Sequence, residues 1–317
     1  MIFKVNPVFK DYIWGGNKLR ESYGKESDLS VVAESWELST HPSGVCKINI
    51  DGKERLLSDY ISEYGKEVLG DKCDQTQEIP ILIKLIDAKD NLSVQVHPDD
   101  EYARIHENDL GKTEMWYILE AEEGAQLVYG FKEELTKEAF KASIENNTLS
   151  DYLNYVNVHK GDVFFITPGT MHAIGKGIVI AEIQESSNVT YRVYDYGRVG
   201  ADGKPRELHI QKALEVTKLN QAEQGTKSYE MVQEEGAKVG TLVECQYFNV
   251  RRIQLESKFQ LVADHNSFHH LLVVEGEVTI IEGDEKLVGR KGDSFFVPAR
   301  TGSYELVGQG EVVLSTL

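Results

Sequence analysis

The stretch Lys160-Gly-Asp-Val-Phe-Phe-Ile-Thr-Pro168 returns later in the chain as Lys291-Gly-Asp-Ser-Phe-Phe-Val-Pro298. Each copy has a Gly-Asp turn, then a short run of aromatic and β-branched residues, then a proline that ends the strand. The copies lie about 130 residues apart, which favours one β module used twice over a solenoid of many repeats. The alternative is coincidence between two hairpins, because Gly-Asp turns are common.

The segments around the two copies combine predicted strands with a few helices. Residues 92–97 and 178–184 have the alternation of side chains that is typical of strands. Thr136 is a plausible N-cap for the first of three predicted helices. Apolar residues at helical spacing place these helices within residues 136–156, 207–219 and 56–70.

Length and repeat together predict two domains. A chain of 317 residues is about twice a typical domain, and its composition is that of an ordinary folded protein. We therefore expect a mostly β protein made of two β barrels with a helical insertion. The first domain is expected over residues 1–235, with the insertion at about 131–157, and the second over residues 236–317.

The charge balance is strongly acidic, with 52 acidic against 34 basic residues and a net charge of −18. This balance argues against a nucleic-acid partner, because a phosphate backbone favours a basic surface. It leaves a small phosphorylated substrate possible. A few basic residues in a cleft decide such binding, since the overall charge is screened beyond about 8–10 Å.

Cysteine usage and apolar runs bear on location. Three cysteines, far apart and odd in number, give neither a disulfide framework nor a paired-cysteine zinc site. The N-terminal segment has no apolar run of signal-peptide length, and no run elsewhere is long enough to span a bilayer. We expect a cytoplasmic protein without a membrane partner, either a monomer or a homodimer.

Four residues form a candidate metal site. Gln95 and His97 lie two apart on one predicted strand, so their side chains point to the same face. Glu114 opens an aromatic-rich strand, where a buried carboxylate needs a partner or a metal. His172 follows the turn after the first copy of the repeat. A lone histidine is more often a surface or core residue, but the four residues together are a plausible ligand set.

The ligand types restrict the metal. Two histidines and a glutamate, with Gln95 as a neutral fourth ligand, suit zinc, iron or manganese. Calcium and magnesium prefer oxygen ligands alone, so the mixed set disfavours them.

At this point the sequence resembles a known family. Cupins have a histidine-containing strand, then a glutamate, then a glycine-to-proline strand closed by Gly-x-x-His. The last segment is here Gly161 to His172. It departs from the cupin pattern in that Pro168 stands directly beside Gly169 rather than one residue earlier. Gln-Val-His in place of the usual His-x-His resembles the type I mannose-6-phosphate isomerases of the short bacterial form. The further matches are Ser93-Val-Gln-Val-His-Pro-Asp-Asp100, Gly111-Lys-Thr-Glu114, Asn188-Val-Thr-Tyr-Arg-Val-Tyr-Asp-Tyr196, Trp14-Gly-Gly16 and Glu34-Ser-Trp36.

The resemblance implies that the two β barrels are cupin-like jelly-rolls, and it also implies an activity and a cofactor. Members of that family interconvert D-mannose 6-phosphate and D-fructose 6-phosphate through an enediol intermediate, in carbohydrate metabolism. The resemblance implies one zinc ion per chain, with iron or manganese as alternatives. It also implies that Arg192 is catalytic. It also implies the metal ligands, at the positions of Gln95, His97, Glu114 and His172.

Three further residues are candidates for catalysis. Lys112 lies two positions before Glu114, so on an extended strand it faces the same cavity, where we expect it to bind substrate and to assist catalysis. Arg192 is expected to bind substrate and to stabilise the enediolate. Glu182 is our candidate base, with the alternative that it only orients a metal ligand. Each cation could instead be a solvated surface charge.

Basic residues also follow Arg192. Arg198, Lys204 and Arg206 form a basic run in an acidic protein. This run could face the substrate phosphate, although a solvated loop explains it equally well.

The second copy of the repeat departs from the metal-site pattern. No histidine follows Pro298 at the position that corresponds to His172. His269 and His270 lack a glutamate and histidine frame, and we interpret them as a surface or strand-edge pair. We therefore expect a second barrel without a metal site.

Two other function classes use the same kind of pocket. A cupin dioxygenase would hold iron with these ligands but would leave Lys112 and Arg192 without a task. A non-catalytic sugar-binding cupin would keep the pocket and lack turnover. An isomerase of another sugar phosphate, such as glucose 6-phosphate, is a closer alternative.

Overall fold

The computed structural model describes residues 1–73, 78–200, 203–222 and 225–317. By compactness the chain forms two units. Unit 1 comprises residues 1–10, 17–85 and 228–317, and unit 2 comprises residues 11–16 and 86–227. This grouping rests on contacts rather than on the repeat, so the domain boundary expected near residue 235 stays a prediction.

Unit 2 is built on two antiparallel sheets. Its strands are β7 (Val94–Val96), β8 (Glu114–Ala121), β9 (Gln126–Phe131), β10 (Leu153–Asn157), β11 (Val163–Ile166), β12 (His172–Ala173), β13 (Ile178–Glu185) and β14 (Tyr191–Tyr194). One sheet has the order β10-β9-β12-β7-β14, and in the other β11, β8 and β13 are neighbours in that order. The strand β6 (Ile81–Ala88) leads the chain from unit 1 into unit 2.

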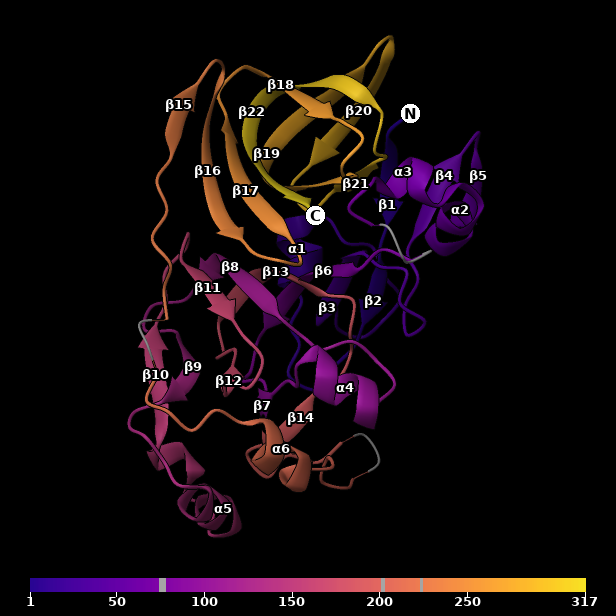
Figure 1. Cartoon of the computed structure of the whole chain (residues 1–317). Coiled ribbons are helices and arrows are strands. Elements are labelled where there is room, and N and C mark those ends of the chain that lie inside the picture. Colours follow the sequence, from indigo (N-terminus) through magenta and orange to yellow (C-terminus); the bar gives the residue numbers. More distant parts are fainter. Residues whose placement is uncertain (74–77, 201–202, 223–224) are drawn as a thin grey trace. The chain divides into compact units, whose positions relative to one another are not determined.

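The helices of unit 2 lie at the ends of its strands (Figure 1). They are α4 (Asp100–His106), α5 (Lys137–Glu145), the 3-10 helix η1 (Leu149–Asp151) and α6 (Ile210–Val216). Thr136 caps α5 as predicted, because its side chain accepts a hydrogen bond from the backbone N–H of Ala139 at 3.1 Å. The predicted helix over 136–156 ends early, at Glu145, because Asn146 and Asn147 leave the helical path and Asn147 has a φ of 57°. The strand β10 follows instead.

An apolar cluster fixes these helices against the sheet. It joins the faces of β7, β9 and β14 that point toward the helices to α5 and α6. Phe131 and Phe140 meet edge to face with ring centroids 5.6 Å apart, and both side chains are fully buried. The cluster lies under the five-stranded sheet and so supports the strands that carry the polar residues described below.

Unit 1 contains the C-terminal part of the chain. Its strands are β1 (Phe3–Asn6), β2 (Val8–Lys10), β3 (Glu34–Leu38), β4 (Lys47–Ile50), β5 (Lys53–Leu56), β15 (Val232–Glu234), β16 (Ala237–Glu244), β17 (Asn249–Leu255), β18 (Lys258–Ala263), β19 (His269–Glu282), β20 (Glu285–Arg290), β21 (Ser294–Val297) and β22 (Gly302–Thr316). Its helices are α1 (Lys18–Tyr23), α2 (Leu57–Tyr64) and α3 (Lys66–Leu69). Figure 1 shows strands β16 to β22 wrapped around a common interior, and that interior is one apolar cluster.

The order of the strands confirms the predicted fold class. The C-terminal sheet runs β15-β16-β17-β22-β19-β21-β1-β4-β5, with β18 paired to β22 and β20 paired to β19. Within the described residues the strands form jelly-roll sheets rather than one continuously hydrogen-bonded barrel. The helices α2, α3 and α6 lie within the ranges 56–70 and 207–219 that helical spacing predicted.

The sequence repeat is also a repeat in structure. Gly161 and Gly292 both adopt a φ of 95°, in the left-handed region that favours glycine. The N–H of Gly161 donates to the carbonyl of Ile118 at 2.8 Å, and that of Gly292 donates to Val273 at 2.7 Å. In both copies the aspartate after the glycine accepts the return bond from the same residue at 2.9 Å. The two turns therefore hold their neighbouring strands in the same way.

This equivalence relates residues in the two copies. Ile166, the last residue of β11, lies opposite Glu114, and Val297, the last residue of β21, lies opposite His269. The position that holds Glu114 in the first copy therefore holds His269 in the second.

The structure corrects one expectation about the second copy. His269 and His270 are buried on β19, with exposed fractions of 8% and 0%, so their interpretation as a surface or strand-edge pair was wrong. The pair lies on a strand that is hydrogen-bonded on both sides, to β21 and to β22, so it is not at a sheet edge.

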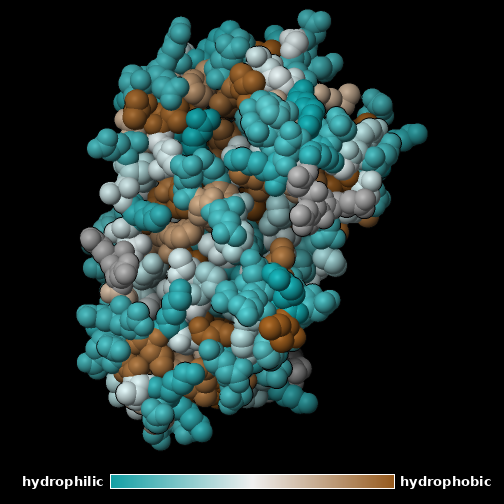
Figure 2. All heavy atoms as spheres, in the orientation of Figure 1, coloured by the Kyte–Doolittle hydropathy of each residue, from teal (hydrophilic) through white to brown (hydrophobic). Residues whose placement is uncertain are grey.

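The surface agrees with the composition. On the face drawn in Figure 2, hydrophilic side chains surround small separate groups of hydrophobic ones. Among the described residues, no helix is both long enough and apolar enough to cross a membrane.

Candidate metal centre

The register of the five-stranded sheet brings the predicted site residues together. Gln95 on β7 lies opposite His172 on β12 and opposite Arg192 on β14. Directly opposed residues point to the same face of a sheet, so these three side chains share one face. His97 follows Gln95 by two positions and continues on that face.

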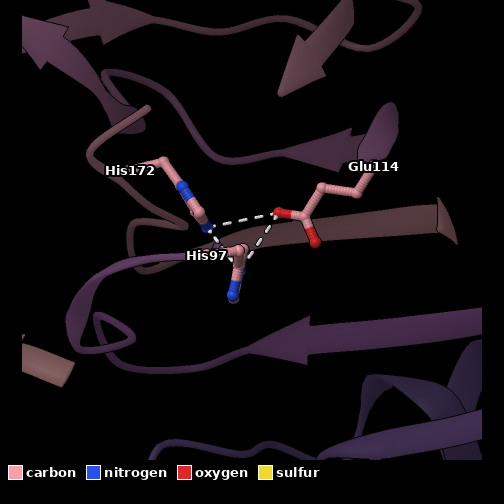
Figure 3. A group of neighbouring side chains, drawn as sticks. All are labelled: His97, Glu114 and His172. Carbon is pink, nitrogen blue, oxygen red and sulfur yellow. Dashed lines mark hydrogen bonds and ion pairs between the residues drawn. The ribbon is translucent and has the colours of Figure 1, made fainter. Parts of the chain in front are cut away.

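Glu114 reaches the same group of residues from the other sheet. It is the first residue of β8, between Ile166 on β11 and Gln184 on β13. Its side chain is fully buried and points toward His97 and His172 in Figure 3. Two sheets, not one, thus supply the polar residues of the site.

His97, Glu114 and His172 form a compact cluster of ligand atoms. One ligand atom from each residue lies within 4.8 Å of the others. The Nε2 atoms of the two histidines are 3.0 Å apart, and His172 Nε2 is 3.2 Å from Glu114 Oε1. The distance from His97 Nε2 to the same oxygen is 3.7 Å. These three residues surround one point in space.

Hydrogen bonds on the far side of each ring fix the protonation of the histidines. His97 Nδ1 lies 2.8 Å from the carbonyl of Val189, and His172 Nδ1 lies 2.8 Å from that of Thr170. A carbonyl oxygen can only accept, so each Nδ1 carries the hydrogen. Each Nε2 therefore faces the other ring, and this is the atom that carries the lone pair of a neutral imidazole. Two such atoms 3.0 Å apart beside a carboxylate favour a cation at this point.

The electrostatics of His172 also favour a ligand role. Burial lowers the pKa of His172 to about 4, and the nearby charge of Lys112 adds to that effect. The ring is therefore neutral near pH 7, which is the form that binds a metal.

Gln95 is the fourth residue that faces the group. Its Nε2 atom lies 3.5 Å from His172 Nε2. In that orientation the amide donates toward the imidazole lone pair, whereas a metal would face the amide oxygen. Rotation of the amide by about 180° exchanges the two atoms at the same place.

Lys112 lies where strand alternation predicted, inside the site. Its Nζ is 2.7 Å from Glu114 Oε2 and 3.3 Å from His97 Nε2, and only 4% of the residue is exposed. Lysine thus holds one oxygen of Glu114 while the other oxygen faces the histidines. This leaves Oε1 of Glu114 as the oxygen that a metal would contact.

Glu182 acts on the site through a tryptophan. It lies opposite Trp116, and its Oε1 accepts a hydrogen bond from Trp116 Nε1 at 3.0 Å. The edge of the Trp116 ring in turn meets the ring of His172, with centroids 5.4 Å apart. This geometry fits the alternative in which Glu182 orients a ligand, and it leaves the role of base untested.

Arg192 has one bound edge and one edge without partners. Its Nη1 donates to the carbonyl of Glu207 at 2.9 Å, whereas its buried Nε has no hydrogen-bond partner among the described residues. Burial lowers the pKa of Arg192, and the charge of Arg206 lowers it further. A half-buried guanidinium with an unpaired N–H is suited to bind an anion.

The predicted basic run folds onto an aspartate. Arg198 Nη2 and Arg206 Nη2 each lie 2.5 Å from Asp195 Oδ1. Burial alone would raise the pKa of Asp195, but hydrogen bonds from Arg206 and Arg198 lower it. Two guanidinium groups around one carboxylate leave a surplus positive charge near Arg192.

Two residues of the site were not singled out in the sequence. Gln184 is fully buried opposite Glu114. It donates to two backbone carbonyls at 2.8 and 2.7 Å, and its Oε1 has no partner among the described residues. His209 accepts a hydrogen bond from the backbone N–H of Arg192 at 3.1 Å. Strand alternation could have indicated Gln184, but nothing local marks His209, which lies 17 residues from its partner.

A jelly-roll whose interior carries two histidines, a carboxylate and an amide defines a cupin with a candidate metal centre. The family model described as "Phosphomannose isomerase type I, catalytic domain" matches residues 2–134. The model described as "Mannose-6-phosphate isomerase, cupin domain" matches residues 238–317.

Curated relatives match over nearly the whole chain. Mannose-6-phosphate isomerase ManA of Bacillus subtilis is 37% identical over 98% of this chain and 97% of its own length. Mannose-6-phosphate isomerase of Streptococcus mutans is 36% identical over 96% of this chain and 94% of its own length. The chain therefore belongs to the type I phosphomannose isomerase family, which confirms the resemblance noted in the sequence.

Solved structures agree with that assignment. The crystal structure of the mannose 6-phosphate isomerase from Bacillus subtilis superposes with a TM-score of 0.93 at 32% identity, covering 100% of this chain and 99% of that one. A zinc-bound mannose 6-phosphate isomerase has the same fold, with a TM-score of 0.80 at 18% identity over 99% and 98% of the two chains.

Proposed function

We propose that this protein interconverts D-mannose 6-phosphate and D-fructose 6-phosphate. The observation that carries the proposal is the pair of histidines whose Nε2 atoms face each other beside the Glu114 carboxylate. Lys112 contacts that carboxylate. Arg192, whose buried Nε has no partner among the described residues, lies opposite Gln95 in the same sheet. Relatives that cover nearly the whole chain carry the name of this isomerase. Membership of the family and the geometry of the site thus support the same reaction.

We also propose one zinc ion per chain. Gln95, His97, Glu114 and His172 would hold it, with iron or manganese as alternatives. The fit rests on two imidazoles whose Nε2 atoms face one point, and on a carboxylate oxygen at the same point. When bound, the ion would supply Lewis-acid polarisation of the sugar oxygens.

The reaction requires three tasks of the protein side chains. A proton must leave C2 of the aldose and return at C1, the negative charge of the enediolate must be stabilised, and the phosphate must be held. Arg192 is our choice for stabilising the enediolate, because its free N–H is fixed by the bond of Nη1 to a backbone carbonyl. Lys112, held by Glu114, is placed to donate to a sugar oxygen.

The proposal also assigns the base and the phosphate site. Glu182 stays the proposed base, and the bond from Trp116 would keep its carboxylate oriented. Arg198 and Arg206 carry more positive charge than Asp195 neutralises, and we assign the phosphate end of the substrate to this region.

Three further expectations rest on composition and on the repeat alone. They are a cytoplasmic location, a monomeric or homodimeric state, and a domain boundary near residue 235. They belong to the proposal and need measurements of their own.

A coupled assay with mannose 6-phosphate tests the proposal. Metal-loaded protein should turn over substrate, chelated protein should lose the activity, and added zinc should restore it. His172→Ala should be inactive under all three conditions and should not retain metal. If metal-loaded protein binds zinc and the sugar phosphate without turnover, it is a sugar-binding cupin and the isomerase proposal is wrong.

A further inference from the structure

The interior of the C-terminal jelly-roll changes from apolar to polar at one end of its strands. On β17 the inward positions Ile253 and Leu255 belong to the apolar core. Arg251, two residues before Ile253 on the same strand, takes the next position on that inner face. The same change occurs on the neighbouring strands, where Leu314 of β22 and Leu271 of β19 are core residues and the next residues on the inner face are Thr316 and His269.

The register places these polar residues side by side. Arg251 lies opposite Leu314, and Asn249 lies opposite Thr316. A cavity of about 240 Å³ opens between them. Its polar lining consists of Asn249, Arg251, His269 and Thr316, and its apolar lining of Leu261, Val262 and Leu314. The polar residues thus face a space large enough for a small ligand.

A buried tyrosine holds the ring of His269. The hydroxyl of Tyr304 lies 2.8 Å from His269 Nδ1, and Tyr304 is only 1% exposed. Burial lowers the pKa of His269 to about 4, with a further contribution from the charge of Arg251. The ring is therefore neutral near pH 7 and carries one N–H that can donate a hydrogen bond.

Arg251 lacks a carboxylate partner. Within the described residues its guanidinium makes no ion pair, although the chain has 52 acidic residues. Asp264 is the carboxylate that acts on His269, and both of its oxygens accept hydrogen bonds from Asn266 at 2.8 Å. An arginine beside a cavity in an acidic protein is thus left to bind something from solution.

All four polar side chains of the lining can donate hydrogen bonds, and no carboxylate lines the cavity. A guanidinium, an imidazole N–H, an amide and a hydroxyl around one space match the oxygens of a tetrahedral anion. The repeat adds a second argument, because His269 occupies the position of Glu114 in the other copy. The copy with the carboxylate is arranged for a cation, and the copy with the imidazole is arranged for an anion.

We propose that the C-terminal jelly-roll binds a phosphate group, free or as a small monoester, between Arg251, His269, Asn249 and Thr316. The site lies entirely within residues 249–316 and is independent of the isomerase reaction proposed above.

Calorimetric titration of inorganic phosphate into the full-length, metal-loaded chain tests this site. All proteins carry Arg192→Ala and Arg206→Gln, so that the anion-binding arginine of the proposed catalytic site and the surplus positive charge of the proposed substrate-phosphate region are both absent. The parent should bind one phosphate per chain. Arg251→Gln should weaken binding at least about tenfold, because a charge-assisted hydrogen bond is lost. Arg251→Lys should fall between the two, since it keeps the charge without the planar fork.

Arg290→Gln is the matched control. Arg290 lies in the same jelly-roll, its side chain is 77% exposed, and it pairs with Glu277 at 3.0 Å. Its substitution removes the same charge and should leave phosphate affinity within about twofold, because exposed pairs contribute little. If Arg251→Gln and Arg290→Gln weaken phosphate binding equally, the effect is one of general charge and the site is refuted. A parent that binds no phosphate refutes it directly.

Two further measurements complete the test. The ring nitrogen signals of His269 should shift when phosphate is added to the parent and should not shift in Arg251→Gln. The melting temperature without phosphate should be the same in both, which shows that Arg251→Gln is folded. Glycerol 1-phosphate then distinguishes a phosphate monoester from free phosphate as the ligand of this site. Tighter binding than that of inorganic phosphate indicates a monoester, and weaker binding indicates the free ion.

Discussion

The two sides of the Arg192 guanidinium differ in their hydrogen bonding. The edge that carries Nη1 is fixed by a backbone carbonyl, and the buried Nε is left without a partner among the described residues. A donor held in this way needs little reorganisation when charge develops next to it, and this is the property that electrostatic catalysis uses. A lysine at the same position would not reproduce the planar geometry.

We predict that Arg192→Ala lowers kcat and kcat/KM by similar factors, of about 10²–10³. The physical reason is that the guanidinium acts on the enediolate and not on the bound substrate. Arg192→Lys should rescue poorly. Steady-state kinetics measure both parameters, while metal content and melting temperature should stay near those of the unsubstituted protein.

A different kinetic pattern would assign Arg192 to the phosphate. In that case KM would rise while kcat stayed unchanged, and the catalytic role would be wrong. Unchanged values of both parameters would make Arg192 a surface residue.

At the scale of elements, the end of β13 holds the start of β8. Glu185 Oε2 accepts a hydrogen bond from the backbone N–H of Thr113 at 2.6 Å, and its own N–H donates to the carbonyl of Thr113 at 3.0 Å. Thr113 stands between Lys112 and Glu114. The two bonds therefore position the segment that carries two residues of the site.

Glu185 makes this connection dependent on pH. Burial raises the pKa of its carboxyl from 4.5 to about 7, against the lowering effect of the bonds from Thr113, and the nearby Asp100 also raises it. The unfolded chain releases this proton near pH 4.5, whereas the folded chain keeps it until about pH 7. The stabilisation from this group is therefore fully present below pH 4.5 and is lost as the pH rises through 7.

We predict that the free energy of unfolding falls between pH 5 and pH 7 by up to about 1.4 kcal/mol per pH unit from this group. Glu185→Gln should flatten that part of the profile, because an amide does not titrate. Denaturant unfolding of the metal-loaded protein at several pH values measures the slope. Glu234→Gln, on an exposed edge strand, is the control and should have the same slope of unfolding free energy against pH as the parent. Equal slopes in Glu185→Gln and the parent would contradict the prediction.

At the scale of the molecule, metal binding and folding are linked. The ligand atoms come from β7, β8 and β12, which lie in two different sheets. An ion that binds only the folded arrangement stabilises it by mass action.

We predict that chelation lowers the melting temperature by several degrees and that added zinc restores it. His172→Ala should melt at the same temperature with and without chelator, because it lacks the site. His159→Ala is the control, since the His159 side chain is 82% exposed, and it should respond to chelator like the parent. A melting temperature that chelator does not change in the parent would show that no ion links these strands.

Much of this architecture can be predicted from local patterns in the chain. Gly-Asp turns, alternation and helix caps indicated the duplicated module, the helices and the same-face arrangement of Gln95 with His97. The placement of Lys112 beside Glu114 followed from alternation as well. These features depend on neighbours within a few residues, which is why the sequence is informative about them.

The remaining features depend on contacts between distant segments. The central position of His269 and His270 in their sheet follows from the pairing of β19 with β21 and β22, and the contact of His209 with Arg192 depends on a loop that returns to β14. The cavity beside Arg251 arises from the register of three strands. No short motif encodes a register, so these features needed the fold.

The shared turn at Gly161 and Gly292 has a consequence for how such a chain can diversify. Identical backbone bonds support a carboxylate in one copy and an imidazole in the other. A duplicated scaffold of this kind can invert the electrostatic polarity of a pocket by exchanging one side chain, without rebuilding the main chain. The ligand preference of each copy is then free to evolve separately, and engineers could use the same position to retarget either pocket.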